Sequence, residues 1–204
     1  DNLTPDDMPK DIYGFTDPSW KGRLGWAPSN GSFQAMLTAM RVMWGDDKTA
    51  DWLVKINANK PRVYPKNTPI VKAASLGEID VGFVNHYYLH RFISEEGEGF
   101  AARNHYLASG GPGSVILVAG AGILKTAVNT TNAEKFLTFM LSMDAQQYFT
   151  DKTFEYPLNK KHPLIDPHDG LISMSNFDNP NIDMASLEDL QGTIKMLREL
   201  GILN

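Results

Sequence analysis

Alternating strand and helix patterns across residues 20–95 are the feature that most restricts the fold of this chain. Short apolar segments at 24–27, 62–64 and 79–84 each precede a stretch whose apolar residues recur at helical spacing. Such alternation is typical of an α/β layer, because each helix carries the chain back to start another parallel strand. The sequence therefore predicts an α/β lobe with a mixed, mostly parallel sheet flanked by helices, and a helical segment at the C-terminal end.

The remaining segments give further expectations. The first 20 residues are rich in Pro and Asp and lack periodicity, so we expect extended chain and turns. The apolar run from Ser114 to Ala119 is typical of a strand buried on both faces. A helix over 133–143 follows Thr131 and Glu134, which have capping-box spacing. The other segments with helical patterns are 33–44, 47–57, 67–77, a start near Leu89, a start at Asp144, and a start at Ser186, with a loop over 159–180.

Composition excludes several classes of protein. A chain of 204 residues with 42% hydrophobic content can bury a real core, which excludes a disordered chain. Its net charge is −5 with scattered Lys and Arg, so we expect neither a nucleic-acid partner nor a polybasic membrane patch. The absence of Cys excludes disulfides, thiol catalysis and Cys-based metal centres. No apolar run approaches the roughly 20 residues of a membrane span.

Two adjacent tyrosines, Tyr87 and Tyr88, come where the strand at 79–84 should end and a helix should begin. In open α/β sheets, ligands bind at this end of the strands. One reading is a buried tyrosine beside an exposed one. The other follows from chemistry, because a phenol with a pKa of about 10 binds a metal as phenolate only when a hard, highly charged cation displaces its proton. Ferric iron is the obvious candidate.

Two expected helix starts could hold an anion. Asn30, Gly31 and Ser32 precede the helix at 33–44, and free backbone N–H groups beside Ser and Asn side chains can bind an oxyanion. The alternative is a plain Ser or Asn N-cap. Asn67 is expected to cap the next helix start, with Pro69 in its first turn.

The segment Gly77 to Tyr88 resembles the tyrosine-pair segment of the ferric-iron-binding periplasmic proteins that serve bacterial iron(III) ABC transporters. The resemblance runs from Leu24 to Gly201, and only the tyrosine pair is specific by itself. It implies a type II periplasmic binding protein fold, two-lobed and hinged, that closes on Fe(III). The other matching segments are 28–33, 64–68, 111–125, 133–146 and 155–158.

The resemblance also implies residue roles. Tyr87 and Tyr88 would be the iron ligands, and a synergistic anion such as phosphate or carbonate would be held by Asn30, Gly31, Ser32 and Asn67. The partner would be an ABC transporter permease. The location would be extracytoplasmic, in the periplasm or at the cell surface. The start of this chain does not read as a signal peptide, so we expect any export signal to have been removed or to lie outside it.

Family members are longer, and nothing in this chain matches their N-terminal portion. We therefore expect a fragment of three parts: residues 20–110 as the second lobe, residues 111–160 as a crossover strand and helices of the incomplete first lobe, and residues 161–204 returning to the second lobe. Two consequences are expected. Iron binding should be weakened, and the strand at 115–119 and the helix face at 136–143 should promote self-association.

Three other functions stay open at this stage. A binding protein of the same fold could take another anion or a sugar. His86 and His90 have i, i+4 spacing that could hold zinc, although a third ligand is lacking. An enzyme is disfavoured, because the five His residues fit no nucleophile motif and the glycines at 120 and 122 do not match a phosphate loop. We therefore expect a binding protein and not an enzyme.

Overall fold

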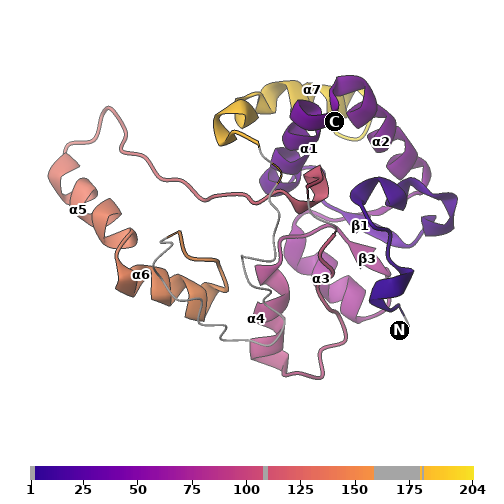
Figure 1. Ribbon diagram of the computed structural model, residues 1–204, viewed down its shortest axis with the longest axis horizontal. Helices are drawn as coiled ribbons and strands as arrows, with labels where there is room; N and C mark the ends of the chain where they lie inside the picture. Colours follow the sequence, from indigo (N-terminus) through magenta and orange to yellow (C-terminus); the bar gives the residue numbers. More distant parts are fainter. Residues whose placement is uncertain (1–2, 108–109, 159–179, 181) are drawn as a thin grey trace. The chain divides into compact units, whose positions relative to one another are not determined.

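The structure is a computed structural model that describes residues 3–107, 110–158, 180 and 182–204. The chain divides into two compact units (Figure 1). The larger unit comprises Asp1–Leu117 and Phe177–Asn204, and the smaller comprises Val118–Asn176. The loop expected over 159–180 lies outside the described residues, apart from Pro180.

A three-stranded parallel sheet lies at the centre of the larger unit. Strand β1 (Leu24–Trp26) is flanked by β2 (Arg62–Val63) and β3 (Val81–Gly82), and both neighbours run parallel to it. Gly25 of β1 is in register with Arg62 on one side and with Gly82 on the other. The predicted fold class is confirmed, and every strand pairing in the described residues is parallel. The third strand is shorter than the 79–84 stretch expected.

Glycines let a helix approach the sheet closely. A Cβ at Gly25 would lie 2.4 Å from Cδ1 of Ile79, and one at Gly82 would lie 2.2 Å from Cγ2 of Ile70. Ile70 belongs to α3 (Asn67–Ser75) and is fully buried. A larger residue at Gly82 would push this helix away from the strands, and one at Gly25 would displace Ile79, which lies just before β3.

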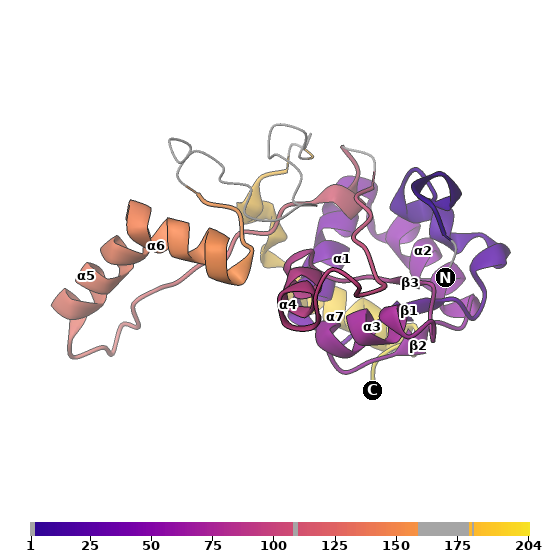
Figure 2. The ribbon, with the colours of Figure 1, turned by 90° about the horizontal axis from the view of Figure 1, so that it is seen from below.

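The two faces of the sheet are covered by different helices, which Figure 1 shows above and below the strands and Figure 2 shows from below. On one side lie α1 (Gly31–Trp44), α2 (Asp46–Ala58) and α7 (Leu190–Glu199), whose buried residues join the main core. On the other side, α3 contributes to two smaller apolar clusters, and α4 (Tyr87–Glu96) packs against it in the one that contains Val71 and Leu89. Helices on both faces are what a parallel sheet requires. The main core comprises Ile12, Phe15, Trp20, Leu24, Trp26, Phe33, Leu37, Met40, Trp52, Leu53, Ile56 and Leu197.

The N-terminal segment is more regular than the sequence suggested. Extended chain and turns were expected, and the turns take the form of three short 3₁₀ helices, η1 (Pro5–Asp7), η2 (Ile12–Thr16) and η3 (Pro18–Trp20). Its backbone is fixed from a distance, since Nε1 of Trp52 donates to the Ile12 carbonyl at 2.9 Å and Nδ2 of Asn59 donates to the Phe15 carbonyl at 3.0 Å. The sequence did not predict this regular backbone, because these contacts come from α2 and its end, far along the sequence.

The C-terminal segment returns to the larger unit and docks on α1. A 3₁₀ turn, η7 (Met184–Glu188), precedes α7, so the helix expected from Ser186 is broken near its start. The Asp189 carboxylate caps α7 by accepting from the Gly192 N–H at 2.9 Å. Arg41 of α1 donates to Asp189 at 3.0 Å, and the hydroxyls of Thr38 and Thr193 lie 2.8 Å apart. We call these contacts the α1–α7 clasp.

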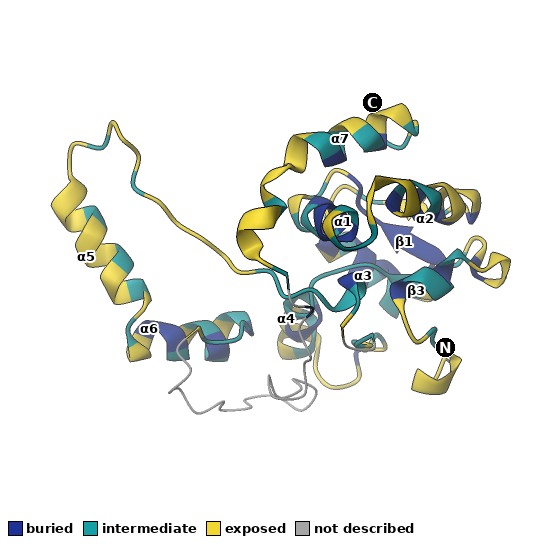
Figure 3. Ribbon diagram, turned by 45° about the horizontal axis from the view of Figure 1, so that its top comes forward, coloured by how far each residue is buried: buried dark blue, intermediate teal, exposed yellow. Residues whose placement is uncertain are grey.

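The smaller unit contains α5 (Thr130–Met140), α6 (Met143–Tyr148) and a π-helical turn, η5 (Phe149–Thr153). The helix expected over 133–143 and the next one expected from Asp144 correspond to α5 and α6. They are separated at Ser142, whose hydroxyl caps α6 by accepting from the Ala145 N–H at 3.3 Å. The capping box expected at Thr131 is absent, since α5 begins at Thr130 after Asn129 without a side-chain cap. No residue of α5 is buried (Figure 3).

The strand expected over 114–119, which was to be the crossover strand of residues 111–160, is not formed. Pro112–Ser114 forms a 3₁₀ turn, η4, and residues 115–119 carry no strand assignment. Val118 is 49% exposed. An apolar run becomes a buried strand only beside another strand, and every strand pair among the described residues involves β1. The assignment of 20–110, 111–160 and 161–204 to the lobes of a longer protein stays a prediction.

No helix in the described ranges is both long and apolar enough to cross a membrane.

Candidate metal and anion site

Three helices begin at the same edge of the parallel sheet. Strand β1 leads into α1, β2 leads into α3, and β3 leads into α4, each through a short connection. Because the strands are parallel, their carboxyl ends lie side by side and the three helix N-termini gather there (Figure 1). Each start directs free backbone N–H groups and a partial positive charge toward this edge.

Side chains from the three connections meet in one hydrogen-bonded cluster, Asn30, Ser32, Asn67 and Asn85, which we call the amide cluster. The Oδ1 atom of Asn85 accepts from the Ser32 hydroxyl at 2.6 Å and from Nδ2 of Asn67 at 3.0 Å. Asn67 is 1% exposed. Two donors thus converge on a single oxygen atom, which is an arrangement that also suits an oxygen of a bound oxyanion.

The start of α1 is capped by its own residue. Oδ1 of Asn30 accepts from the N–H groups of Ser32 at 2.9 Å and of Phe33 at 3.4 Å, so the plain N-cap alternative is realised for this side chain. Oδ1 of Asn30 also lies 2.6 Å from the Ser32 hydroxyl. That hydroxyl has one proton and two acceptors, Asn30 and Asn85, so it satisfies only one of them at a time.

Gly31 is open to solvent. It is exposed, and a Cβ built on it would meet no atom within 4 Å. The space beside Gly31 at the start of α1 is therefore open, while the next two N–H groups are capped by Asn30. Of the residues predicted to hold an anion, Asn30, Ser32 and Asn67 are brought together by hydrogen bonds, and Gly31 lies at the open front of the same helix start.

Asn67 differs in one detail from the expectation. It is the first residue of α3, Lys66 is the N-cap, and neither makes a side-chain cap. The Asn67 amide instead points away from its own helix and reaches Asn85. The buried side-chain amide of Asn67 is tolerated because Asn85 accepts a hydrogen bond from it.

Tyr87 and Tyr88 form the first turn of α4. Their ring centroids are 4.5 Å apart and the rings are tilted by 30°, so adjacent side chains that would normally diverge around a helix lie nearly parallel. Both tyrosines are half-buried, so the reading of one buried and one exposed tyrosine does not hold. Asn85 lies two residues before the tyrosine pair. It therefore links the pair to the amide cluster along the chain.

Arg91 lies against both tyrosines. Its guanidinium carbon is 5.5 Å from the centroid of the Tyr87 ring and 5.5 Å from that of Tyr88. These residues are four and three positions before Arg91, the two spacings that share one face of a helix. At this distance a guanidinium is attracted by the faces of the aromatic rings.

Sequence reasoning did not assign Asn85 or Arg91 to the site. Asn85 was visible only as part of a polar run, and its role depends on contacts with Ser32 and Asn67, which are 53 and 18 residues away. The spacing of Arg91 from the tyrosine pair was a usable signal. It would have placed a cation on the same helix face as both phenols.

The alternative zinc site gains little support. The rings of His86 and His90 lie 6.4 Å apart. Within the described part of the chain, no group of three or more His, Cys, Asp or Glu residues could hold a metal ion.

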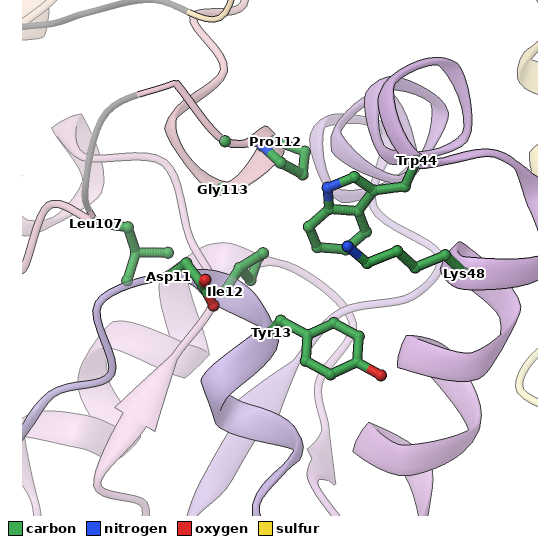
Figure 4. Close-up of a pocket in the computed structure, with 9 residues that line it drawn as sticks. Asp11, Ile12, Tyr13, Trp44, Lys48, Leu107, Pro112 and Gly113 are labelled. Atoms are coloured by element: carbon green, nitrogen blue, oxygen red, sulfur yellow. The ribbon is translucent and has the colours of Figure 1, made fainter.

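A separate cavity of about 140 Å³ lies in the larger unit between η2 and the junction of α1 and α2 (Figure 4). The ammonium of Lys48 lies 4.6 Å from the Trp44 ring and 5.6 Å from the Tyr13 ring at its wall. None of the residues of the candidate site lines this cavity.

Comparisons with known proteins identify the family and the fold of this chain. The chain matches the family of bacterial extracellular solute-binding proteins over residues 1–173. The major ferric iron-binding protein of Neisseria meningitidis is 29% identical over 202 residues, which is 98% of this chain and 60% of that protein. Iron uptake protein A2 of Synechocystis is 33% identical over 176 residues, 82% of this chain and 50% of that protein. The iron-bound structure of HitA from Pseudomonas aeruginosa is similar with a TM-score of 0.87 and 30% identity, over 96% of this chain and 62% of that one.

This chain therefore belongs to the bacterial extracellular solute-binding proteins, a family of binding proteins and not of enzymes. Within that family it is similar to the ferric iron-binding proteins, which confirms the resemblance predicted from the tyrosine-pair segment. The type II periplasmic binding protein fold is confirmed by the same similarity. The chain spans about 60% of the length of the Neisseria relative.

Proposed function

We propose that this chain is the solute-binding component of a bacterial ABC importer for Fe(III), with an extracytoplasmic location and a transporter permease as its partner. The observation that carries the proposal is the 4.5 Å separation of the Tyr87 and Tyr88 rings, which follow Asn85, the centre of the amide cluster, by two residues along the chain. The names of the Neisseria and Synechocystis relatives support iron as the solute.

In this proposal Tyr87 and Tyr88 bind Fe(III) as phenolates. Hard oxygen ligands suit a hard trivalent cation, and the metal's charge displaces the phenol protons. Two phenolates neutralise two of the three charges of Fe(III) and leave several coordination positions open. An anion at the amide cluster fills part of them, and the other positions are left to water or to further protein ligands.

The anion is held by Asn30, Gly31, Ser32 and Asn67, and we add Asn85 to this set. The N–H group of Gly31 at the open helix start, the Ser32 hydroxyl and the Asn67 amide are donors directed at the same edge of the sheet. Phosphate or carbonate matches these donors, because each offers several oxygens that accept hydrogen bonds.

The test of the metal site replaces each tyrosine by phenylalanine. Tyr87→Phe, Tyr88→Phe and the double variant keep the rings and the packing but remove the phenolate oxygens. We expect the visible phenolate-to-iron absorption to fall sharply in each single variant and to vanish in the double variant, while the free energy of unfolding changes by less than about 1 kcal/mol. Tyr148→Phe in the smaller unit is the matched control. Equal iron uptake by the wild type and the double variant would reject the proposal.

The anion site is tested at Gly31. A Cβ there meets nothing within 4 Å, so Gly31→Ala and Gly31→Val should fold normally and project a methyl or isopropyl group into the space of the anion. We expect the stimulation of ferric binding by added phosphate to fall modestly in Gly31→Ala and by about tenfold in Gly31→Val. Phosphate stimulation that is unchanged in Gly31→Val would mean that the anion binds elsewhere.

A further inference from the structure

Arg91 is an exposed cation next to the candidate metal site, and no carboxylate among the described residues forms a salt bridge with it. Its guanidinium instead rests on the faces of the Tyr87 and Tyr88 rings, at 5.5 Å from each centroid. Of the other arginines, Arg23, Arg41 and Arg62 pair with carboxylates, and Arg103 and Arg198 donate to backbone carbonyls. Arg91 is therefore distinguished by a guanidinium that makes no hydrogen bond to the described residues.

The charges around the tyrosine pair are unbalanced once iron is bound. Two phenolates leave one positive charge of Fe(III) uncompensated, and Arg91 adds a second. The amide cluster of Asn30, Ser32, Asn67 and Asn85 is neutral, and the three helix N-termini add positive potential. The part of the site that this chain supplies therefore favours a co-bound anion with more than one negative charge.

The position of Arg91 also sets the length that a co-bound anion needs if it is to reach both the amide cluster and this guanidinium. Arg91 is the fourth residue after Tyr87, which corresponds to a rise of about 6 Å along the axis of α4. A compact anion at the amide cluster has its oxygens close together and cannot also extend along α4. A di- or tricarboxylate has a second carboxylate several bonds away, and arginine binds carboxylates through two parallel hydrogen bonds.

We propose that Arg91 is a specificity-determining residue that makes this site favour Fe(III) accompanied by a di- or tricarboxylate over Fe(III) accompanied by a compact monoanion. The inference rests on the proposed function, because it takes Tyr87 and Tyr88 as the iron ligands. One carboxylate binds at the metal and the amide cluster, and another pairs with the exposed guanidinium. The side chain keeps its contact with the aromatic rings and turns its free N–H groups toward the ligand.

The test titrates Fe(III) into the wild type, Arg91→Gln and Arg91→Lys, and follows the phenolate-to-iron absorption in bicarbonate or in citrate. Citrate also chelates iron in solution, but this effect is the same for every variant and cancels in the ratio to the wild type. Arg198→Gln is the control, because it removes the same charge from an exposed position on α7. Circular dichroism checks that each variant is folded.

We expect Arg91→Gln to lower the apparent affinity for iron about tenfold in citrate and less than about twofold in bicarbonate. Arg91→Lys should recover part of the loss, since it keeps the charge but not the paired donors. Arg198→Gln should match the wild type in both anions. An equal loss for Arg91→Gln in both anions, or no loss in citrate, would overturn the role of Arg91 and leave the iron site standing. If no protein shows the absorption with either anion, or if the double tyrosine variant retains it, the proposed function falls and this inference falls with it.

Discussion

Helices α1 and α5 have similar apolar patterns in the sequence and opposite surroundings in the structure. Six residues of α1 are buried, including Leu37 and Met40 at 0% exposure, whereas α5 has no buried residue and its Phe136 and Phe139 are 59% and 55% exposed. The first helix lies in the unit with the sheet, and the second lies in the unit whose described residues form no strand. An amphipathic pattern therefore predicts that a helix forms, but it does not predict which partner covers its apolar face.

The largest expected effect is the loss of stability on truncating an apolar side chain, which should be large in α1 and small in α5. Leu37→Ala removes a fully buried side chain and should lower the free energy of unfolding of the larger unit by about 3 kcal/mol. Phe136→Ala should change it by less than about 0.5 kcal/mol, because its ring is more than half exposed. All four tryptophans lie at positions 20–52, so their fluorescence during denaturation reports on the larger unit. Similar losses for both variants would show that α5 is covered in solution.

The next effect concerns what covers α5. Phe136 and Phe139 are three residues apart and share a face of the helix, so an uncovered face should promote the self-association that the sequence predicts. We expect light scattering to show concentration-dependent association of the wild type and a marked reduction in the variant Phe136→Ser with Phe139→Ser. A wild type that stays monomeric at high concentration would contradict this prediction.

A smaller effect is expected at the α1–α7 clasp of the larger unit. The side chain of Arg41 is 13% exposed and pairs with Asp46 and Asp189, whose side chains are about 60% exposed. We expect Arg41→Met to cost about 1–2 kcal/mol, since solvent weakens the pairs while the hydrogen bond to Thr193 is lost as well. Lys195→Met, at an exposed position of α7, should have a negligible effect on the same unfolding curve.

The smallest effect is the pH dependence of the clasp. The Gly192 N–H, and after it the Arg41 guanidinium, hold the pKa of Asp189 below its usual value. A depressed pKa in the folded state stabilises the fold above the unfolded value of about 3.9, and this contribution is lost as the pH falls through the lower folded value. The stability difference between the wild type and Asp189→Asn should therefore shrink from pH 6 toward pH 3. A difference that grows on acidification would show that the sign is wrong.

Much of the larger unit could be predicted from the sequence. The strands near residues 24, 62 and 81 and the helices α1, α2, α3 and α4 were expected within a few residues, because their apolar spacing and their Gly and Pro punctuation are local properties. The 3₁₀ helices of the first 20 residues were not predicted, because Trp52 and Asn59 fix their backbone from another part of the chain. The run at 115–119 was mispredicted because a strand exists only with a neighbour.

The candidate site divides in the same way. The residue types of Tyr87, Tyr88, Asn30, Ser32 and Asn67, and their places after strands, were readable in the sequence, because parallel strands end at one edge of a sheet. Only the tertiary structure decided that Asn85 joins Ser32 to Asn67, that the two tyrosine rings lie nearly parallel, and that Arg91 covers both. The physical reason is the distance along the chain over which each interaction acts. Local periodicity and chain direction fix which residues reach the edge, whereas hydrogen bonds and ring contacts between separate segments fix how those residues meet.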